Sequence, residues 1–367
     1  MIYYLLFPLK AYFTPLNMLG YISFRASSAA ITAILIAFIF GKPIIAFLQR
    51  LSFSEVIRSD GPASHLKKAG TPTMGGLLIH LCVLIPTFLW ADLSNRLVHM
   101  VLLATIWMGL IGFWDDYHKI KRRDKNGISP RVKLLAQSSL GIVIGSLIYF
   151  YPINAELSGA TIVPFFKGFS INLGIFYILF AMLVINGTSN AVNLTDGLDG
   201  LATGLMSIVA LALAAIAYIS GRIDFSAYLN IPYIPGAGEL TIFLAAMFGG
   251  LLGFLWYNAK PAEVFMGDVG SLAYGAAIGT SAVLLKQELL LFIIGGVFVM
   301  ETISVMLQIS WFKCTKRRLG AGRRIFKMAP IHHHFELKGW EESKVVVRFW
   351  ILGILFALMA LATFKIR

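Results

Sequence analysis

Long apolar runs constrain the fold of this chain more than any other feature of its sequence. ITAILIAFIF (31–40), WMGLIGFW (107–114) and LFIIGGVFVM (291–300) carry no charged residue and lack the strict alternation of a membrane β-barrel. Hydrophobic residues make up 58% of the chain and charged residues 13%, whereas soluble domains are about 45–50% apolar and about 25% charged. The sequence therefore predicts an all-α integral membrane protein.

The apolar runs divide into ten predicted membrane helices. A hydrocarbon core about 30 Å thick requires about 20 helical residues, and on that basis the spans are 26–48, 74–91, 97–114, 132–151, 170–187, 200–219, 240–257, 269–285, 289–311 and 345–364. The N-terminal residues 1–25 are apolar but interrupted by Pro8 and Pro15. Without a basic start or a small-residue cleavage site, they are expected to be a retained interfacial segment rather than a signal peptide. We expect residues 1–367 to form a single polytopic domain.

The distribution of Lys and Arg predicts the orientation. Alternate loops, beginning after the first span, hold 21 of the 31 basic residues: 49–73, 115–133, 188–199, 258–268 and 312–344. The opposite loops and the two termini hold 8. The positive-inside rule places the first set in the cytoplasm and both termini outside. This bias accounts for most of the net charge of +13, so we expect no nucleic-acid partner. For the two cysteines, Cys82 and Cys314, we expect unpaired thiols.

Polar motifs gather at the predicted cytoplasmic ends of the spans. They are GTPTMGG (70–76), DDY (115–117), NLTDGLDG (193–200), WYNAKPAEVFMGDVGS (256–271) and APIHHHFELKGW (329–340). The predicted outside loops carry no comparable cluster. Such one-sidedness indicates a functional site at one face of the membrane.

Each aspartate in these motifs also has a purely structural interpretation. Asp115 and Asp116 could pair with nearby basic residues at a membrane boundary, and Asp196, Asp199 or Asp268 could cap a helix. A calcium-binding EF-hand is excluded, because the twelfth position counted from Asp196 is Ser207 rather than Glu. Taken together, the acids are typical of a hard-cation site, since Mg²⁺ prefers one or two carboxylates together with substrate phosphate oxygens.

The histidine run and one intramembrane acid complete the candidates. Three consecutive side chains, His332 to His334, cannot share one face of a helix or strand. Zinc would need separated ligands, so contact with phosphate is the better interpretation, with a solvated basic loop as the alternative. Glu301 lies inside the ninth predicted span; it marks a functional site or bonds to a neighbouring helix, and we weight the second slightly more.

The motifs resemble those of the polyprenyl-phosphate N-acetylhexosamine-1-phosphate transferases. DDY at 115, NLTDGLDG, VFMGDVGS (264–271) and APIHHHFELKGW carry the resemblance, which runs essentially from end to end. The last motif, together with RSDGPASHLKKAGTPTMGG (58–76), resembles one branch of the family. That branch transfers phospho-MurNAc-pentapeptide from UDP-MurNAc-pentapeptide to undecaprenyl phosphate, giving lipid I and UMP, and requires Mg²⁺.

The resemblance implies a ten-span enzyme of the bacterial inner membrane, commonly a homodimer, with a cytoplasmic active site. It implies that Asp268 is the magnesium ligand and that Asp115 and Asp116 are catalytic, with His333 assigned to the same group. For substrate binding it implies Lys68, Thr73, Lys133, Asn193, Asp196, Asp199, Asn258, Phe265, His332 and His334. A cation-coupled transporter is disfavoured, because only Glu301 fits a midplane site and no internal repeat is found. A relative that uses another UDP-sugar is disfavoured by the histidine run. Direct attack by the lipid phosphate is favoured over a covalent aspartyl-phosphate route, which stays open.

Overall fold

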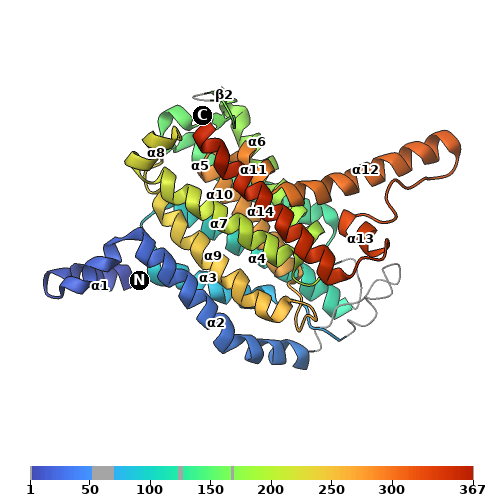
Figure 1. Cartoon of the computed structure of the whole chain (residues 1–367), viewed down its shortest axis with the longest axis horizontal. Coiled ribbons are helices and arrows are strands. Elements are labelled where there is room, and N and C mark those ends of the chain that lie inside the picture. The colour runs from blue at the N-terminus through green and yellow to red at the C-terminus, as the bar shows by residue number, and fades with distance from the viewer. Residues whose placement is uncertain (1, 52–69, 123–126, 167–168, 367) are drawn as a thin grey trace.

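The protein is a bundle of helices (Figure 1), here in a computed structural model that describes residues 2–51, 70–122, 127–166 and 169–366. The long helices are α2 (Ile22–Arg50), α3 (Gly76–Trp90), α4 (Arg96–Arg122), α5 (Pro130–Phe150), α6 (Tyr177–Thr195), α7 (Leu201–Ser220), α9 (Ala237–Asn258), α10 (Gly267–Leu284), α12 (Gly296–Leu319) and α14 (Glu342–Ile366). The shorter elements are α1 (Ile2–Leu6), η1 (Phe7–Ala11), η2 (Thr14–Gly20), η4 (Ala155–Leu157), η5 (Gly174–Phe176), α8 (Ile223–Leu229), α11 (Glu288–Ile294) and α13 (Ile331–Glu336). Strands β1 (Ala160–Ile162) and β2 (Ser170–Asn172) form an antiparallel pair in which Ala160 lies opposite Asn172.

Eight helices in the described part of the chain are long and apolar enough to cross a membrane: α2, α4, α5, α6 with η5, α7, α9, α12 and α14. The expectation of an all-α membrane protein is therefore confirmed. Two further predicted spans correspond to α3, with 15 residues, and to α10, with 18. Residues 2–20 form only short helical pieces before α2 begins.

The boundaries of three predicted spans are wrong, and the fifth span also ends later than expected, at Thr195 rather than at 187. Helix α4 continues to Arg122 instead of ending at 114, because Lys119 pairs with Asp115 one turn earlier and extends the helix into polar sequence. Helix α6 begins at Tyr177 rather than 170, since residues 170–172 pair as a strand with β1. The ninth span is divided at Gly295 into α11 and α12, and α12 runs on to Leu319 into the predicted loop 312–344.

Helix α10 occupies the centre of the bundle. Its residues from Asp268 to Leu284 are all buried, and it packs mainly against α4 and α6. The sequence GDVGSLAYGAAIGTSAVL is rich in Gly, Ala and Ser, and small side chains let neighbouring helices approach closely in a membrane. The central helix therefore brings Asp268, at its start, against helices from either side.

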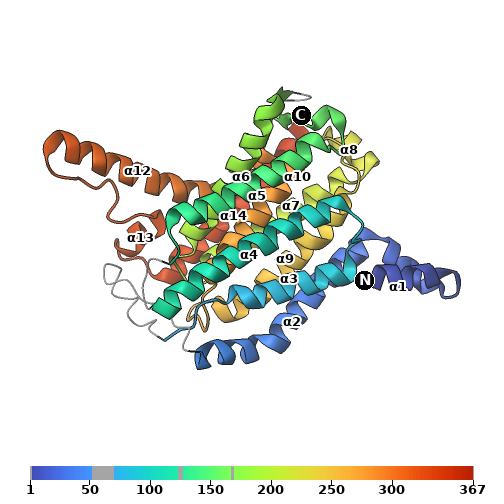
Figure 2. The same cartoon turned by 180° about the vertical axis from the view of Figure 1, so that it is seen from behind.

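The two ends of the bundle contain different structural elements. The first residues of α2 and the last of α14 lie at the same end, together with β2 and α8 (Figures 1 and 2). Helix α13 lies toward the opposite end, beside the long helix α12, which projects from the body (Figure 1). Only 22% of the most apolar stretch of α12 is buried inside the protein, so most of its surface would face lipid.

Candidate active site

Two glycines let α4 and the start of α10 touch. A Cβ atom on Gly112 would lie 2.2 Å from the carbonyl oxygen of Asp268, so only glycine permits this approach. Gly267 enters α10 with a φ of +71°, and a Cβ there would lie 2.5 Å from Asp116 Oδ2. Because Asp115 and Asp116 follow Gly112 by one helical turn, the contact places both of them beside Asp268.

Asp115, Asp116 and Asp268 form a buried group, which we call the carboxylate cluster. One oxygen from each lies within 4.8 Å of the others. The two neighbours on α4 have different partners: Asp115 Oδ1 accepts a hydrogen bond from Ile128 N (2.9 Å), and Asp116 Oδ2 accepts one from Val269 N (3.1 Å). Asp116 thereby ties α4 to the first turn of α10, while Asp115 holds the segment that precedes α5.

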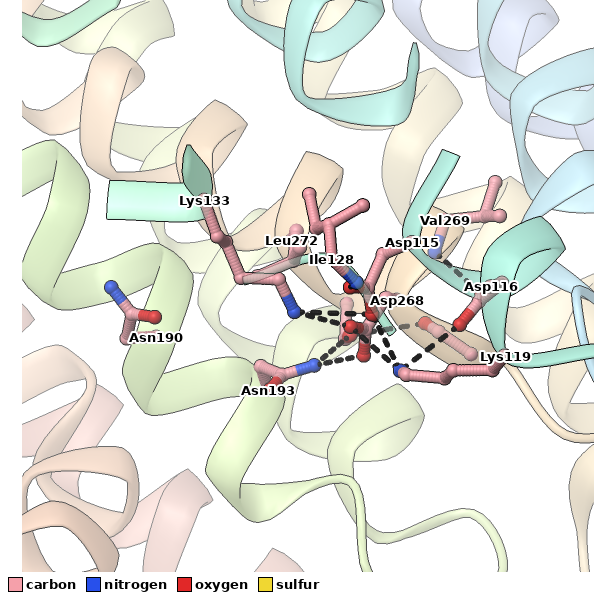
Figure 3. Close-up of polar contacts among 12 residues, drawn as sticks. Asp115, Asp116, Lys119, Ile128, Lys133, Asn190, Asn193, Asp268, Val269 and Leu272 are labelled. Atoms are coloured by element: carbon pink, nitrogen blue, oxygen red, sulfur yellow. Dashed lines mark hydrogen bonds and ion pairs between the residues drawn. The ribbon is translucent and has the colours of Figure 1, made fainter. Parts of the chain in front are cut away.

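Two lysines neutralise much of this charge (Figure 3). Lys119 Nζ lies 2.6 Å from Asp115 Oδ2, 3.0 Å from Asp268 Oδ2 and 3.4 Å from Asp116 Oδ1. Lys133 Nζ lies 2.6 Å from Asp268 Oδ2 and 3.3 Å from Asp115 Oδ2. Both lysines are partly exposed, so the cluster opens to solvent on the lysine side.

Residues on α5 and α6 also contact Asp268. Ser129 caps α5 by accepting a hydrogen bond from Val132 N, and Pro130 occupies the first helical turn; Lys133 follows in that same turn. Asn193, in the last turn of α6, donates from Nδ2 to Asp268 Oδ1 (2.6 Å) and to Ser271 Oγ (2.9 Å). Asn193 therefore lies on a helix, not in the predicted loop 188–199.

The carboxylate cluster fits a hard divalent cation by its donor set. Its three carboxylates outnumber the ammonium groups of Lys119 and Lys133 by one. Carboxylates offer oxygen atoms as ligands, which Mg²⁺ prefers. Among the described residues, no group of metal-ligating side chains contains the histidine run. The zinc alternative therefore gains no support from the described part of the chain.

The histidine run lies on α13 and is held by Glu301. Glu301 Oε2 accepts a hydrogen bond from Ile331 N (2.9 Å), and Glu301 Oε1 lies 3.1 Å from His332 Nδ1. Both side chains are fully buried. A Cβ on Gly197 would lie 2.4 Å from His332 Nε2 and 3.4 Å from His333 Nε2. His332, His333, Glu301 and Gly197 thus form a second group, the histidine cluster.

The third histidine contacts other residues. His334 Nδ1 accepts a hydrogen bond from Lys327 N (3.1 Å), and its ring packs edge-on against Phe326. Burial, and then the positive charges of Lys338 and Lys327, lower the pKa of His334 and so favour its neutral form. As the sequence predicted, the three rings do not share one face.

The other predicted site residues surround these two clusters. A Cβ on Gly267 would lie 3.0 Å from Thr73 Oγ1, so Thr73 borders the carboxylate cluster. Phe265 is half-buried, and its backbone pairs with Pro72 and Gly75. Asn258 is buried and forms hydrogen bonds with Thr203 and with the Val264 carbonyl; within the described residues it forms none with either cluster.

The DGLDG loop carries Asp196 and Asp199 between α6 and α7. Asp196 is the C-cap residue of α6, and the N-cap of α7 is Gly200, so the two acids do not share a helical face and neither caps α7. Asp199 Oδ2 accepts a hydrogen bond from Ala262 N (3.2 Å), and Asp199 N donates to Glu342 (3.0 Å). Lys68 lies outside the described residues.

The sequence matches known transferases along its whole length. Residues 98–286 match glycosyl transferase family 4, and residues 68–79 match signature 1 of the phospho-N-acetylmuramoyl-pentapeptide-transferases. Proteins named phospho-N-acetylmuramoyl-pentapeptide-transferase from Citrifermentans bemidjiense, Desulfotalea psychrophila and Endomicrobium trichonymphae are 52%, 51% and 48% identical to it, over 100% of both chains. The chain belongs to the phospho-N-acetylmuramoyl-pentapeptide-transferase family.

The sequence analysis did not predict Lys119 as a site residue, although it contacts all three carboxylates of the cluster. Basic residues near Asp115 and Asp116 were interpreted only as possible ion-pair partners at a membrane boundary. The available signal was the spacing of Lys119, three and four residues after Asp116 and Asp115, which matters only if α4 continues past residue 114. For Glu301, the structure agrees with the second interpretation, a bond to a neighbouring helix, because its carboxylate contacts Ile331 and His332 on α13.

Proposed function

We propose that the chain transfers phospho-MurNAc-pentapeptide from UDP-MurNAc-pentapeptide to undecaprenyl phosphate. An oxygen of the lipid phosphate attacks the phosphorus that bears MurNAc, the bond from that phosphorus to the UMP oxygen breaks, and UMP leaves. The products are UMP and lipid I. The observation that carries the proposal is the carboxylate cluster with its two lysines, within a chain that is about half identical to named transferases over its full length.

The electrostatics of the cluster suit a reaction between two anions. In phosphoryl transfer, catalysis consists mainly of positioning and charge stabilisation. Lys119 and Lys133 would turn from Asp268 toward the substrate phosphates. Asp268, with Asp115 and Asp116 beside it, would hold Mg²⁺, which when bound offsets the negative charge of the phosphates.

Asp115 is proposed as the base that accepts the proton of the lipid phosphate. Asp116 accepts a hydrogen bond from the backbone of α10, and we propose that it holds that helix against α4 while taking part in catalysis beside Asp115. This assignment corresponds to direct attack rather than to a covalent aspartyl-phosphate.

The remaining predicted residues are proposed to bind the substrates. Asn193 and Thr73 border the carboxylate cluster and would contact the diphosphate. His332 and His333 would contact phosphate or sugar from the histidine cluster, and His333 is proposed to take part in catalysis. Lys68, Asp196, Asp199, Asn258, Phe265 and His334 keep their proposed places in the nucleotide and sugar site, with Phe265 offering a face to uracil.

We also propose the finer membrane arrangement. The eight long apolar helices, together with α3 and α10, make ten crossings, with α11 and α12 as one interrupted crossing. The excess of Lys and Arg in alternate loops supports a cytoplasmic position for α13 and the carboxylate cluster, with both termini outside, in the bacterial inner membrane. Residues 1–367 would act as one domain, as a homodimer.

The orientation predicts opposite labelling at two exposed acids. Glu341 precedes α14 on the proposed cytoplasmic side, and Glu156 lies in η4 on the proposed outer side. With Cys314, the exposed native cysteine, replaced by Ser, cysteine at 156 should react with an impermeant thiol reagent in intact cells. Cysteine at 341 should react only after the membrane is opened. Equal labelling of both in intact cells would contradict the ten-crossing arrangement.

UMP release tests the reaction itself. The purified protein should release UMP from UDP-MurNAc-pentapeptide when undecaprenyl phosphate and Mg²⁺ are present. Little release is expected if the lipid is omitted or the metal is chelated. Equal release with and without lipid would indicate hydrolysis rather than transfer, and equal release from a UDP-sugar without the peptide would contradict the proposed donor.

A further inference from the structure

Two amide side chains, the buried Gln137 and the partly buried Asn190, join α5 to α6 one turn away from the carboxylate cluster. Asn190 Nδ2 donates to Gln137 Oε1 (2.9 Å), and Gln137 Nε2 donates back to Asn190 Oδ1 (3.3 Å). Gln137 is 2% exposed, and Figure 3 shows Asn190 farther from the carboxylate cluster than Asn193. Each amide oxygen of the pair accepts a hydrogen bond from the other side chain, and Asn190 Nδ2 also donates to the Asn186 carbonyl of its own helix (2.8 Å).

The amide pair continues into a third helix. Ser189 Oγ, next to Asn190, donates to the carbonyl oxygen of Leu272 on α10 (3.0 Å), and Gln137 Nε2 lies 3.5 Å from the same hydroxyl. The side chains of Gln137, Ser189 and Asn190 and the Leu272 carbonyl therefore pin α5, α6 and α10 at one level of the bundle. We call these four groups the amide lock.

Each helix of the amide lock also supplies a residue to the centre of the carboxylate cluster. On α5, Lys133 precedes Gln137 by four residues; on α6, Asn193 follows Asn190 by three; on α10, Asp268 precedes Leu272 by four. Three and four residues are one helical turn, so each pair lies on one helical face. Lys133 and Asn193 bind the two different oxygens of Asp268, each at 2.6 Å.

In this arrangement, the register of α5 against α6 decides where Lys133 and Asn193 lie relative to Asp268. A slip of one residue along an α-helix moves a side chain by about 1.5 Å, and a misplacement of about 1 Å can cost about 10²-fold in rate. Hydrogen bonds weaken steeply with distance and angle, so a slip of α5 against α6 would break both bonds of the two-way amide pair. The lock is thus suited to fix where Lys133 and Asn193 meet Asp268.

We infer that Gln137 is a positioning residue: its bond to Asn190 sets the register of α5 against α6 that brings Lys133 and Asn193 onto Asp268. This inference rests on the proposed function. The competing explanation is that the pair only adds stability to the α5–α6 interface. The same interface contains a suitable comparison, since Asn186 Nδ2 donates to Ser138 Oγ (3.0 Å) one turn farther from the cluster than Asn190.

The test compares three full-length variants in detergent with lipid substrate. Gln137→Met keeps the size of the side chain and removes both amide bonds, and we expect kcat to fall about 10–100-fold with a smaller change in KM. Ser138→Ala, the matched control, breaks the other interhelical bond and should keep kcat within about 2-fold, because small deletions away from the site have small effects. The exchange Gln137→Asn with Asn190→Gln restores an amide at each position and should recover most of the lost turnover.

Melting temperatures measured on the same samples separate positioning from stability. The inference requires Gln137→Met and Ser138→Ala to melt at similar temperatures and to differ in kcat. It is overturned if Gln137→Met turns over normally, if both variants slow equally, if turnover follows melting temperature across the set, or if the well-folded exchange variant is as slow as Gln137→Met. Failure of the unchanged protein to release UMP would instead contradict the proposed function, and the inference with it.

Discussion

Replacing Asp268 by Asn is expected to lower turnover by about 10³-fold in a protein that still folds. The shape of the side chain is kept, but the charge that a divalent cation needs is removed from the point where Lys119, Lys133 and Asn193 converge. Steady-state UMP release over a range of Mg²⁺ concentrations, with a melting curve on each sample, measures the effect.

The matched control for Asp268→Asn is Asp224→Asn. Asp224 is an exposed acid that pairs with Arg222 on the surface, and surface pairs contribute little to stability, so this variant should be as active as the unchanged protein. Unchanged turnover and magnesium dependence in Asp268→Asn would rule out Asp268 as the metal ligand.

Replacing Asp115 by Asn is expected to lower turnover by about 10²–10⁴-fold, the usual contribution of a general base. The second pKa of a phosphate monoester is near 6, so the lipid phosphate loses its proton unaided as the pH rises. The deficit of Asp115→Asn should therefore shrink with increasing pH. A pH–rate profile of the variant beside that of the unchanged enzyme measures this, with Asp224→Asn as the control.

The covalent route makes a different prediction for the same variant. An aspartyl-phosphate would let the enzyme exchange labelled UMP into UDP-MurNAc-pentapeptide in the absence of lipid, and a covalent nucleophile would be needed at every pH. If enzyme rigorously freed of undecaprenyl phosphate catalyses that exchange and Asp115→Asn does not, direct attack with Asp115 as base is wrong.

The sequence could predict the features that depend on composition and local order. Apolar runs of membrane length predicted the helices, because the bilayer imposes the same requirement on every crossing. The motif DDY and the motif GDVGS were each predicted at the end of a span, and the structure brings Asp115, Asp116 and Asp268 from them into one cluster. The position of these acids at the predicted cytoplasmic ends of spans was enough to indicate a candidate cation site, and the resemblance to the transferase family supplied their separate roles.

Contacts between helices were decided by the tertiary structure alone. Four such contacts join residues far apart in sequence: the approach of α4 to α10 at Gly112, the ion pair of Lys119 with Asp268, the contact of Glu301 with His332, and the amide lock. Hydrophobic periodicity reports which face of a helix is apolar, but not which neighbour that face meets or at what register. The neighbour and the register depend on side-chain size and on buried hydrogen bonds between the packed helices. An unpaired polar group inside a membrane costs free energy, and small residues allow helices to approach closely.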